Sequence, residues 1–330
     1  MNRTFKLKFT VLVFLLVFSA VPSLMLGSAD LTFSEVIGGL LRRDGYQTAE
    51  IILYSIRIPR FIAAVTAGAG LAVSGAILQT VIGNELASPS TIGVNAGAGL
   101  AVIICLSIIP TAVKLLPAAA FIGALITVIT VLTIARAAGR GKSTIILAGI
   151  ACTTLFQAAI SFLSILDSDV MSIYSSFSVG SLSGVRTERM IIPLVLIITC
   201  TVAGICMSGR IAALSLGDAV ASSLGVRVRK LRIFCLILAS ICAASAISFA
   251  GLLGFVGLVA PHMTRKLVGS DIKALLSASP VLGAILVTLS DLAGRTVFSP
   301  SEIPVGIVMA FIGAPFFFIL ILRKGGSKSA

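Results

Sequence analysis

Few side chains in this sequence could take part in bond chemistry. The 330 residues include one histidine, His262, so neither a two-histidine metal motif nor a Ser-His-Asp set can be assembled. The six cysteines all lie in apolar runs without CxxC spacing, which indicates buried thiols rather than metal ligands. We therefore predict no enzyme, no catalytic residue, no metal site and no cofactor held by this chain.

The segment Gly139–Thr144, GRGKST, resembles part of a phosphate-binding loop. That motif requires glycine where this sequence has Arg136, and it requires a preceding strand where this sequence has an apolar helix. We interpret the segment as a basic loop between membrane spans. Any ATP used by this protein must then bind to partner subunits.

Three arginines lie at the ends of apolar stretches, at the ends that we place on the outer side of the membrane. They are Arg57, Arg60 and Arg295. Asp291 and Arg295 are four residues apart on one helix face, which predicts a local ion pair. The arginines could reach toward lipid headgroups, or they could dock an acidic partner through bidentate guanidinium–carboxylate pairs. The residues alone leave both possibilities open.

The segment Met207–Arg232 is a long, basic interruption in an apolar chain. It carries five basic residues against one acid, Asp218. Two short amphipathic helices are expected, about Ile211–Leu216 and Asp218–Leu224, with Gly217 and Gly225 as breaks. We predict that residues 208–232 form a surface for a cytoplasmic partner.

A second glycine-patterned segment, Gly254–Arg265, reads GFVGLVAPHMTR. Gly254, Gly257 and Pro261 predict a tight bend or structural hinge, because glycine and proline favour breaks in a helix. His262 beside them is interpreted as an interfacial structural residue rather than a ligand.

The amino-acid composition indicates to which class of protein the chain belongs. Hydrophobic residues make up 58% of the chain and charged residues 11%, against about 45–50% and about 25% in soluble domains. Apolar stretches of about 20 residues recur, the length that crosses a bilayer as helix. We therefore predict an all-α membrane protein, a single domain over residues 1–330. The expected spans are Thr10–Leu26, Ile58–Val81, Thr91–Ile109, Leu115–Ala135, Ser143–Leu166, Met190–Met207, Ile233–Ala260, Leu275–Ala293 and Val305–Leu322.

The distribution of charge sets the expected topology. If Ile233–Ala260 counts as two crossings, broken near Gly251 and Gly254, the inside segments hold 17 of the 25 basic residues and three of the 12 acids. This agrees with the preference of basic loops for the cytoplasm. We expect about ten transmembrane helices, one of them short or broken near residues 251–261, with both termini in the cytoplasm. The net charge of +13 then reflects topology rather than binding to nucleic acid.

Eight motifs in chain order resemble the permease subunits of ABC importers for iron-siderophores, haem and cobalamin (the FecCD type). They are RIPR (57–60), AGAGLAVSGAILQ (67–79), NELASPSTIGVNAGAG (84–99), VGSLSG (179–184), LGDAVASSLGV (216–226), GLLGFVGLVAPHMTR (251–265), SDLAGR (290–295) and EIPVGIVMAFIGAPFF (302–317). The resemblance covers the chain from about Arg57 to its C-terminus. One departure is Glu85, where the family usually has proline.

The resemblance implies two permease subunits side by side, identical or paralogous, in a bacterial cytoplasmic membrane. It also implies two cytoplasmic ATPase subunits below and a substrate-binding protein that docks above. It implies that the substrate-binding protein docks through its carboxylates on Arg57, Arg60 and Arg295. It also implies ATPase coupling through the residues of the LGDAVASSLGV motif, namely Leu216, Gly217, Asp218, Ala219, Ala221, Leu224, Gly225 and Val226.

The expected function is therefore ATP-driven import, by alternating access, of a ferric siderophore or a related iron chelate, haem or cobalamin. The alternative is an ion-coupled secondary transporter. Such carriers usually bury an acid near the middle of the membrane, whereas Glu85 and Asp218 fall in predicted cytoplasmic turns.

Overall fold

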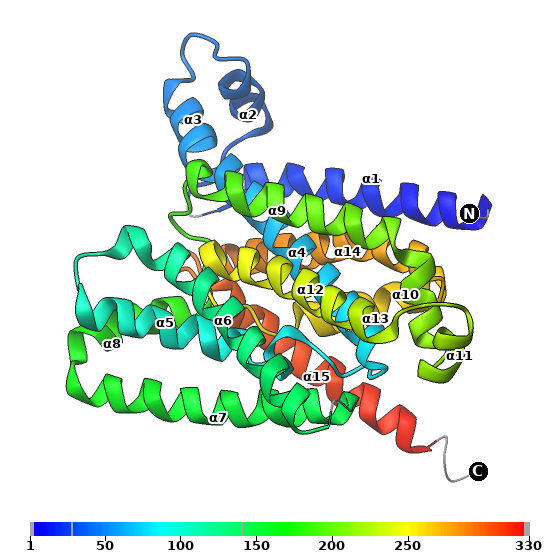
Figure 1. Cartoon of the computed structure of the whole chain (residues 1–330). Helices are drawn as coiled ribbons and strands as arrows, with labels where there is room; N and C mark the ends of the chain where they lie inside the picture. The colour runs from blue at the N-terminus through cyan, green and yellow to red at the C-terminus, as the bar shows by residue number, and fades with distance from the viewer. Residues whose placement is uncertain (1–2, 28, 140, 327–330) are drawn as a thin grey trace.

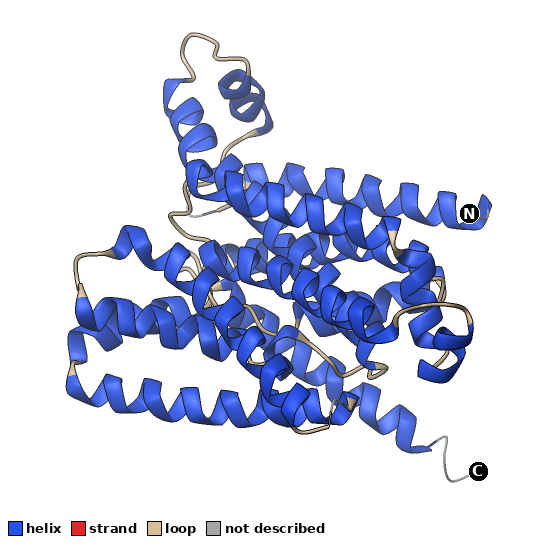
Figure 2. Ribbon diagram, viewed as in Figure 1, coloured by secondary structure: helices blue, strands red, loops and turns tan. Residues whose placement is uncertain are grey.

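The computed structural model describes residues 3–27, 29–139 and 141–326, which fold as a bundle of helices without strands (Figures 1 and 2). The α-helices are α1 Arg3–Met25, α2 Phe33–Leu40, α3 Gln47–Ile52, α4 Ile58–Ile82, α5 Val94–Ile108, α6 Leu116–Ala137, α7 Lys142–Leu166, α8 Ser168–Val179, α9 Thr187–Cys206, α10 Ser208–Ser215, α11 Asp218–Ser223, α12 Val228–Ala250, α13 Val256–Val268, α14 Ile272–Thr296 and α15 Val305–Gly326. A π-helical turn, Leu53–Arg57, and two 3-10 turns, Pro89–Ile92 and Val113–Leu115, complete the described elements.

Within the described residues, seven helical segments are long and apolar enough to cross a membrane. They contain α1, α4, α6, α7, α9, α12 and α14, and two shorter apolar helices, α5 and the apolar part of α15, accompany them. With the short α13, these helices confirm the predicted all-α bundle of about ten membrane segments.

Helix α4 lies at the centre of the bundle and α1 at its edge. In the most apolar window of each helix, 78% of the residues are buried in α4 but only 17% in α1. Small residues allow this central position: a Cβ on Gly68 would strike the backbone of Gly283 in α14, and one on Gly75 would strike Gly257 in α13. Close backbone approach at glycine is the usual way for membrane helices to pack.

The predicted break in Ile233–Ala260 is confirmed, and it lies at Gly251–Phe255, between α12 and α13. Its open backbone is paired inside the protein, because Leu252 N–H donates to the Phe177 carbonyl at 3.1 Å and Ser181 N–H donates to the Ala250 carbonyl at 3.0 Å. Irregular backbone at membrane depth is tolerated only when protein buries it in this way.

Two predicted loops contain more helix than the sequence suggested. The expected spans leave residues 167–189 and 261–274 as connections, but the first contains α8 and α13 continues into the second as far as Val268. The residue after α12 is Gly251, at φ +74°, so the chain turns one helical turn before Gly254 and well before Pro261, which lies inside α13.

The two ends of the bundle differ. The start of α1 and the helices α10 and α11 lie at one end, whereas α8 and the α2–α3 pair lie toward the other (Figure 1). The segments that the charges place together thus share one end, and which end faces the cytoplasm remains a prediction. We refer to these ends as the inner and outer ends.

Candidate functional site

Arg60 lies at the centre of a buried ion cluster at the outer end. Its Nε donates to both carboxylate oxygens of Asp291 at 3.0 Å, and one terminal nitrogen donates to Oε2 of Glu302 at 2.7 Å. The Arg60 and Asp291 side chains are 9% and 3% exposed, whereas Glu302 is 33% exposed. The cluster therefore joins the start of α4 to the end of α14 and to the loop before α15.

Arg295 and Arg57 bind the C-terminal end of α1. Arg295 donates to the carbonyls of Leu26 at 3.0 Å and Ser23 at 2.7 Å, and Arg57 donates to the Leu24 carbonyl at 2.6 Å and to the Ala29 carbonyl. The last carbonyls of a helix lack partners within the helix and carry partial negative charge. These two guanidinium groups therefore cap α1.

All three arginines predicted to dock an acidic partner are thus buried, at 4% exposure for Arg57, 8% for Arg60 and 4% for Arg295. The predicted Asp291–Arg295 pair is present, with Nε 3.3 Å from Oδ2. Sequence inspection missed the bond from Arg60 to Asp291, because the two residues are 231 positions apart. Docking by these arginines remains a prediction, and a partner would have to reach them past Glu302.

At the inner end, α10 and α11 form the expected pair of short helices. Gly217 separates them at φ +106°, and Gly225 follows α11 at φ +79°. A Cβ at either position would meet open space. Glycine is therefore favoured here by backbone conformation, since other residues rarely adopt positive φ.

The α10–α11 pair presents apolar side chains to its surroundings. Leu216, Val220 and Leu224 follow one another at four-residue spacing, and they are 64%, 44% and 63% exposed. Of the other predicted residues, Ala221 is fully buried and holds α11 against the bundle. The exposed ones are Asp218, Ala219 and Gly225, and the partly exposed ones are Gly217 and Val226. Val220 was absent from the predicted set, although its spacing from Leu216 and Leu224 is visible in the sequence.

Asp218 ties α11 to two other helices. Arg232 of α12 donates to its Oδ1 at 2.6 Å, and Lys142 Nζ at the start of α7 lies 3.7 Å from the same oxygen. The hydrogen bond from Arg232 lowers the pKa of the Asp218 carboxyl below its ordinary value of 3.8, and Lys142 acts in the same direction. Asp218 is thus a connection between the α10–α11 pair and the spans.

The predicted hinge residues lie where α13 packs on α4 and α15. Gly257 approaches α4 closely, and Gln79 of α4 donates to the Gly257 and Leu258 carbonyls at 3.3 and 3.4 Å. Arg265 donates to Gln79 Oε1 at 2.5 Å.

The other predicted hinge residues lie in the break and in α13. Gly254 lies in the open break, and Pro261 and His262 are buried in α13. The His262 ring packs edge-on against Phe316 with centroids 5.7 Å apart. Gln79 and Arg265 were not predicted as a pair.

Comparison with known proteins decides the family. The model of the FecCD transport family matches residues 13–323. This chain belongs to the FecCD transport family. It is 37% identical over 314 residues to the Fe(3+)-citrate import system permease protein YfmE of Bacillus subtilis (strain 168), covering 94% of this chain and 93% of that protein. It is 34% identical over 324 residues to the hemin transport system permease protein HmuU of Yersinia pestis, covering 96% of both chains.

The fold of this FecCD chain also matches a solved structure. An inward-facing transporter assigned to the metal-chelate type of ABC transporters superposes with a TM-score of 0.85 at 28% identity, covering 96% of this chain and 98% of that one. Together these matches confirm the predicted class, a membrane permease subunit for transport, and they give no support to the ion-coupled alternative.

Proposed function

We propose that this FecCD permease carries a ferric siderophore or a related iron chelate, haem or cobalamin into the cytoplasm, driven by partner ATPase subunits. Family membership and relatives named for Fe(3+)-citrate and hemin transport support this substrate class. ATP binds to the partners, and this chain contributes the pathway together with a second permease copy or a paralogue.

The link to an ATPase rests on one observation, the exposed apolar row Leu216, Val220 and Leu224 on a helix pair at the inner end. Apolar side chains that protrude from a loop outside the membrane indicate a protein contact. Asp218 connects this pair to α12 and α7, so that movement of an attached ATPase would be transmitted to the spans. Alternating access follows when the spans tilt in response.

The test is assembly with the ATPase subunits of the same importer. Leu224→Ser should weaken ATPase binding by about tenfold to a hundredfold, because burial of a leucine at an interface contributes about 1.5–3 kcal/mol. Leu267→Ser is the matched control, an exposed leucine at the end of α13 outside the pair. Equal loss in both variants, or uptake by this chain in liposomes driven by an ion gradient without ATPase, would contradict the proposal.

Docking of a substrate-binding protein at the outer end is the second part of the proposal. Glu302 forms an ion pair with Arg60 and is the most exposed member of the cluster. A carboxylate of the binding protein would have to replace it, which predicts that Glu302→Gln tightens docking severalfold by removing the competing charge. Surface plasmon resonance with the full transporter would measure this. Unchanged or weaker docking would instead assign Arg60 a purely structural role.

A further inference from the structure

A cavity of about 260 Å³ opens between the inner ends of α6, α7 and α12. Two helix faces provide most of its lining. On α6 these residues are Ile129, Leu132, Thr133, Ala135 and Arg136, and on α12 they are Arg229, Arg232, Ile233, Leu236 and Ile237. Their spacing of three and four residues places each set on one face of its helix.

The cavity opens where one face of α12 is left uncovered at its inner end, while the opposite face stays packed through Leu231 and Cys235. From Leu238 to Ala250 nearly all of α12 is buried, whereas Ile233 and Ile237 are 36% and 40% exposed. On the facing helix Ile129 is 58% exposed. The mouth is therefore apolar and continuous with the surface that the bundle presents to hydrocarbon.

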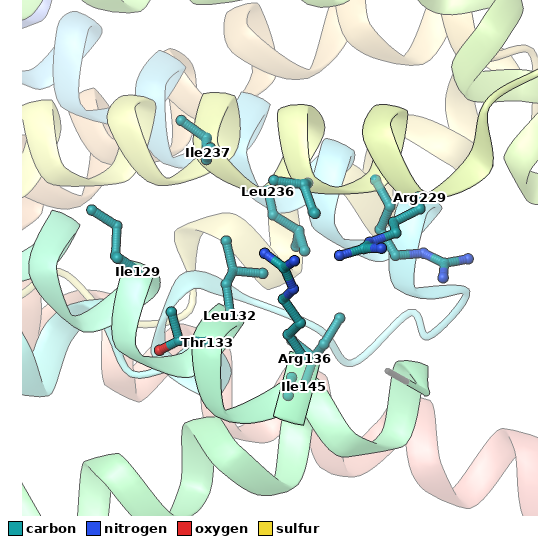
Figure 3. Close-up of a pocket in the computed structure, with 11 residues that line it drawn as sticks. Ile129, Leu132, Thr133, Arg136, Ile145, Arg229, Leu236 and Ile237 are labelled. Carbon is teal, nitrogen blue, oxygen red and sulfur yellow. The ribbon is translucent and has the colours of Figure 1, made fainter. Parts of the chain in front are cut away.

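The opposite end of the cavity is strongly basic. Arg136 closes α6, and Arg229 and Arg232 lie in the first turns of α12. Figure 3 shows the guanidinium of Arg136 projecting from the end of α6 into the space beside α12, where Arg229 also lies. The residues that line the cavity include no acid.

Arg232 is the most buried of these arginines, and it is already paired with an acid. Arg232 is 9% exposed, and it uses a terminal nitrogen to hold Asp218 at 2.6 Å. Its Nε is buried without a hydrogen-bond partner among the described residues. Because this nitrogen has almost no accessible surface, Arg232 contributes its positive charge to the wall of the cavity rather than a hydrogen bond from Nε.

We propose that this cavity binds an anionic phospholipid of the inner leaflet. The phosphate group lies among Arg136, Arg229 and Arg232, and one acyl chain follows Ile129 and Ile237. Ile129 is seven residues from Arg136, about 10 Å along the helix, which separates the apolar contacts from the charges as headgroup and chain are separated in a lipid. Basic pockets between membrane helices on the cytoplasmic side are suited to anionic headgroups.

A free anion would explain the arginines but not the rest of the cavity. Inorganic phosphate has no apolar part that would contact the isoleucine side chains, whereas a phospholipid has an anionic headgroup for the arginines and an acyl chain for the isoleucines. The occupied site would bridge α6 and α12 beside the Arg232–Asp218 bond, which attaches the α10–α11 pair.

The experiment is native mass spectrometry of the whole chain released from detergent. Phosphatidylglycerol should be retained in preference to phosphatidylcholine. Arg136→Gln with Arg229→Gln should weaken its binding about 30-fold, because each basic residue near the headgroup contributes about 1 kcal/mol, which is about fivefold. Arg232 is left intact because it holds Asp218. The control, Lys6→Gln with Lys273→Gln, removes two exposed basic residues from α1 and α14 outside the cavity.

A further variant distinguishes the possible occupants of the cavity. Ile237→Trp fills the apolar mouth without changing charge, and it should weaken lipid binding while leaving any binding of inorganic phosphate unchanged. Equal retention of both lipids, equal loss in the control, or occupancy by inorganic phosphate with no effect of Ile237→Trp would overturn the proposal. Displacement of the lipid by added ATPase subunits would reassign the cavity to that protein interface.

Discussion

Asp291 is the residue on which the outer end of the molecule depends. It lies almost wholly buried between Arg60 and Arg295, which come from two different helices. A buried carboxylate is tolerated only when paired, and removing it leaves the buried Arg295 without its carboxylate and the buried Arg60 with Glu302 alone. The cluster thus holds α1, α4 and α14 together where the chain leaves the membrane.

Asp291→Asn keeps the shape of the side chain and removes its charge. It should destabilise the solubilised chain by about 3–5 kcal/mol, since the partner charges stay buried. Arg42→Gln is the control, because the Arg42–Glu50 pair is exposed at 67% and 34% and should contribute less than about 1 kcal/mol. Thermal unfolding in detergent measures both, and similar midpoints for the two variants would contradict the structural role of Asp291.

Asp218 gives a pH dependence of known sign. The hydrogen bond from Arg232 lowers the pKa of Asp218 in the folded chain. The ion pair therefore stabilises the fold above pH 3.8, and this stabilisation is lost as the pH falls below that value and the carboxylate is protonated. Because the Asp218 side chain is 49% exposed, the effect should stay below about 1 kcal/mol.

The measurement is the stability difference between the wild-type chain and Asp218→Asn as a function of pH. The difference should be present at about pH 7 and vanish as the pH falls below 3.8. A difference that is independent of pH would show that the amide substitution acts through something other than charge.

At the scale of elements, α4 is packed so closely that its glycines determine which helices can surround it. Gly75 meets Gly257 of α13 backbone to backbone, whereas a Cβ added at Gly204 of α9 would have Cδ1 of Ile77 as its nearest neighbour, at 3.5 Å. The same substitution should therefore have opposite effects at these two membrane positions.

Gly75→Ala should destabilise the bundle by about 1–3 kcal/mol, because the added methyl group has no space without backbone shifts. Gly204→Ala should be neutral or stabilise by up to about 1 kcal/mol, because alanine favours helix over glycine. Unfolding of both variants in the same detergent compares them directly. Equal destabilisation would mean that space at the helix contact does not decide the result.

At the scale of the whole molecule, α4 joins the two ends. It carries Arg60 of the outer cluster near its start and Gln79, which binds the α13 backbone and Arg265, near its end. The α10–α11 pair is attached beside this inner region through Asp218. We therefore expect a movement imposed at the inner end to be transmitted through a packed helix rather than through flexible loops.

Gly225→Val tests this transmission in the complete transporter. Valine at φ +79° is strained, so the end of α11 should shift although no neighbouring atom is displaced. ATP hydrolysis should continue while uptake falls severalfold, measured side by side in liposomes. Gly209→Val, at a position in α10 with equally open space and ordinary φ, should leave the ratio of uptake to hydrolysis near that of the wild type.

The sequence by itself determined the class and most of the elements. Apolar runs of membrane length and the distribution of basic residues are local properties, and so are the two glycines that separate and end the α10–α11 pair. They predicted a bundle of about ten membrane helices, the break after α12 and the Asp291–Arg295 pair, because these depend on spacing within one helix or one loop.

Only the tertiary structure decided where the arginines of the outer end point and what they bind. Arg60 meets Asp291 from 231 positions away, and Arg57 and Arg295 bind carbonyls of α1, contacts that follow from helix packing and leave no periodic signal. The cavity between α6 and α12 arises for the same reason: both faces are visible in the sequence, but the separation of the two helices is a property of the packed bundle.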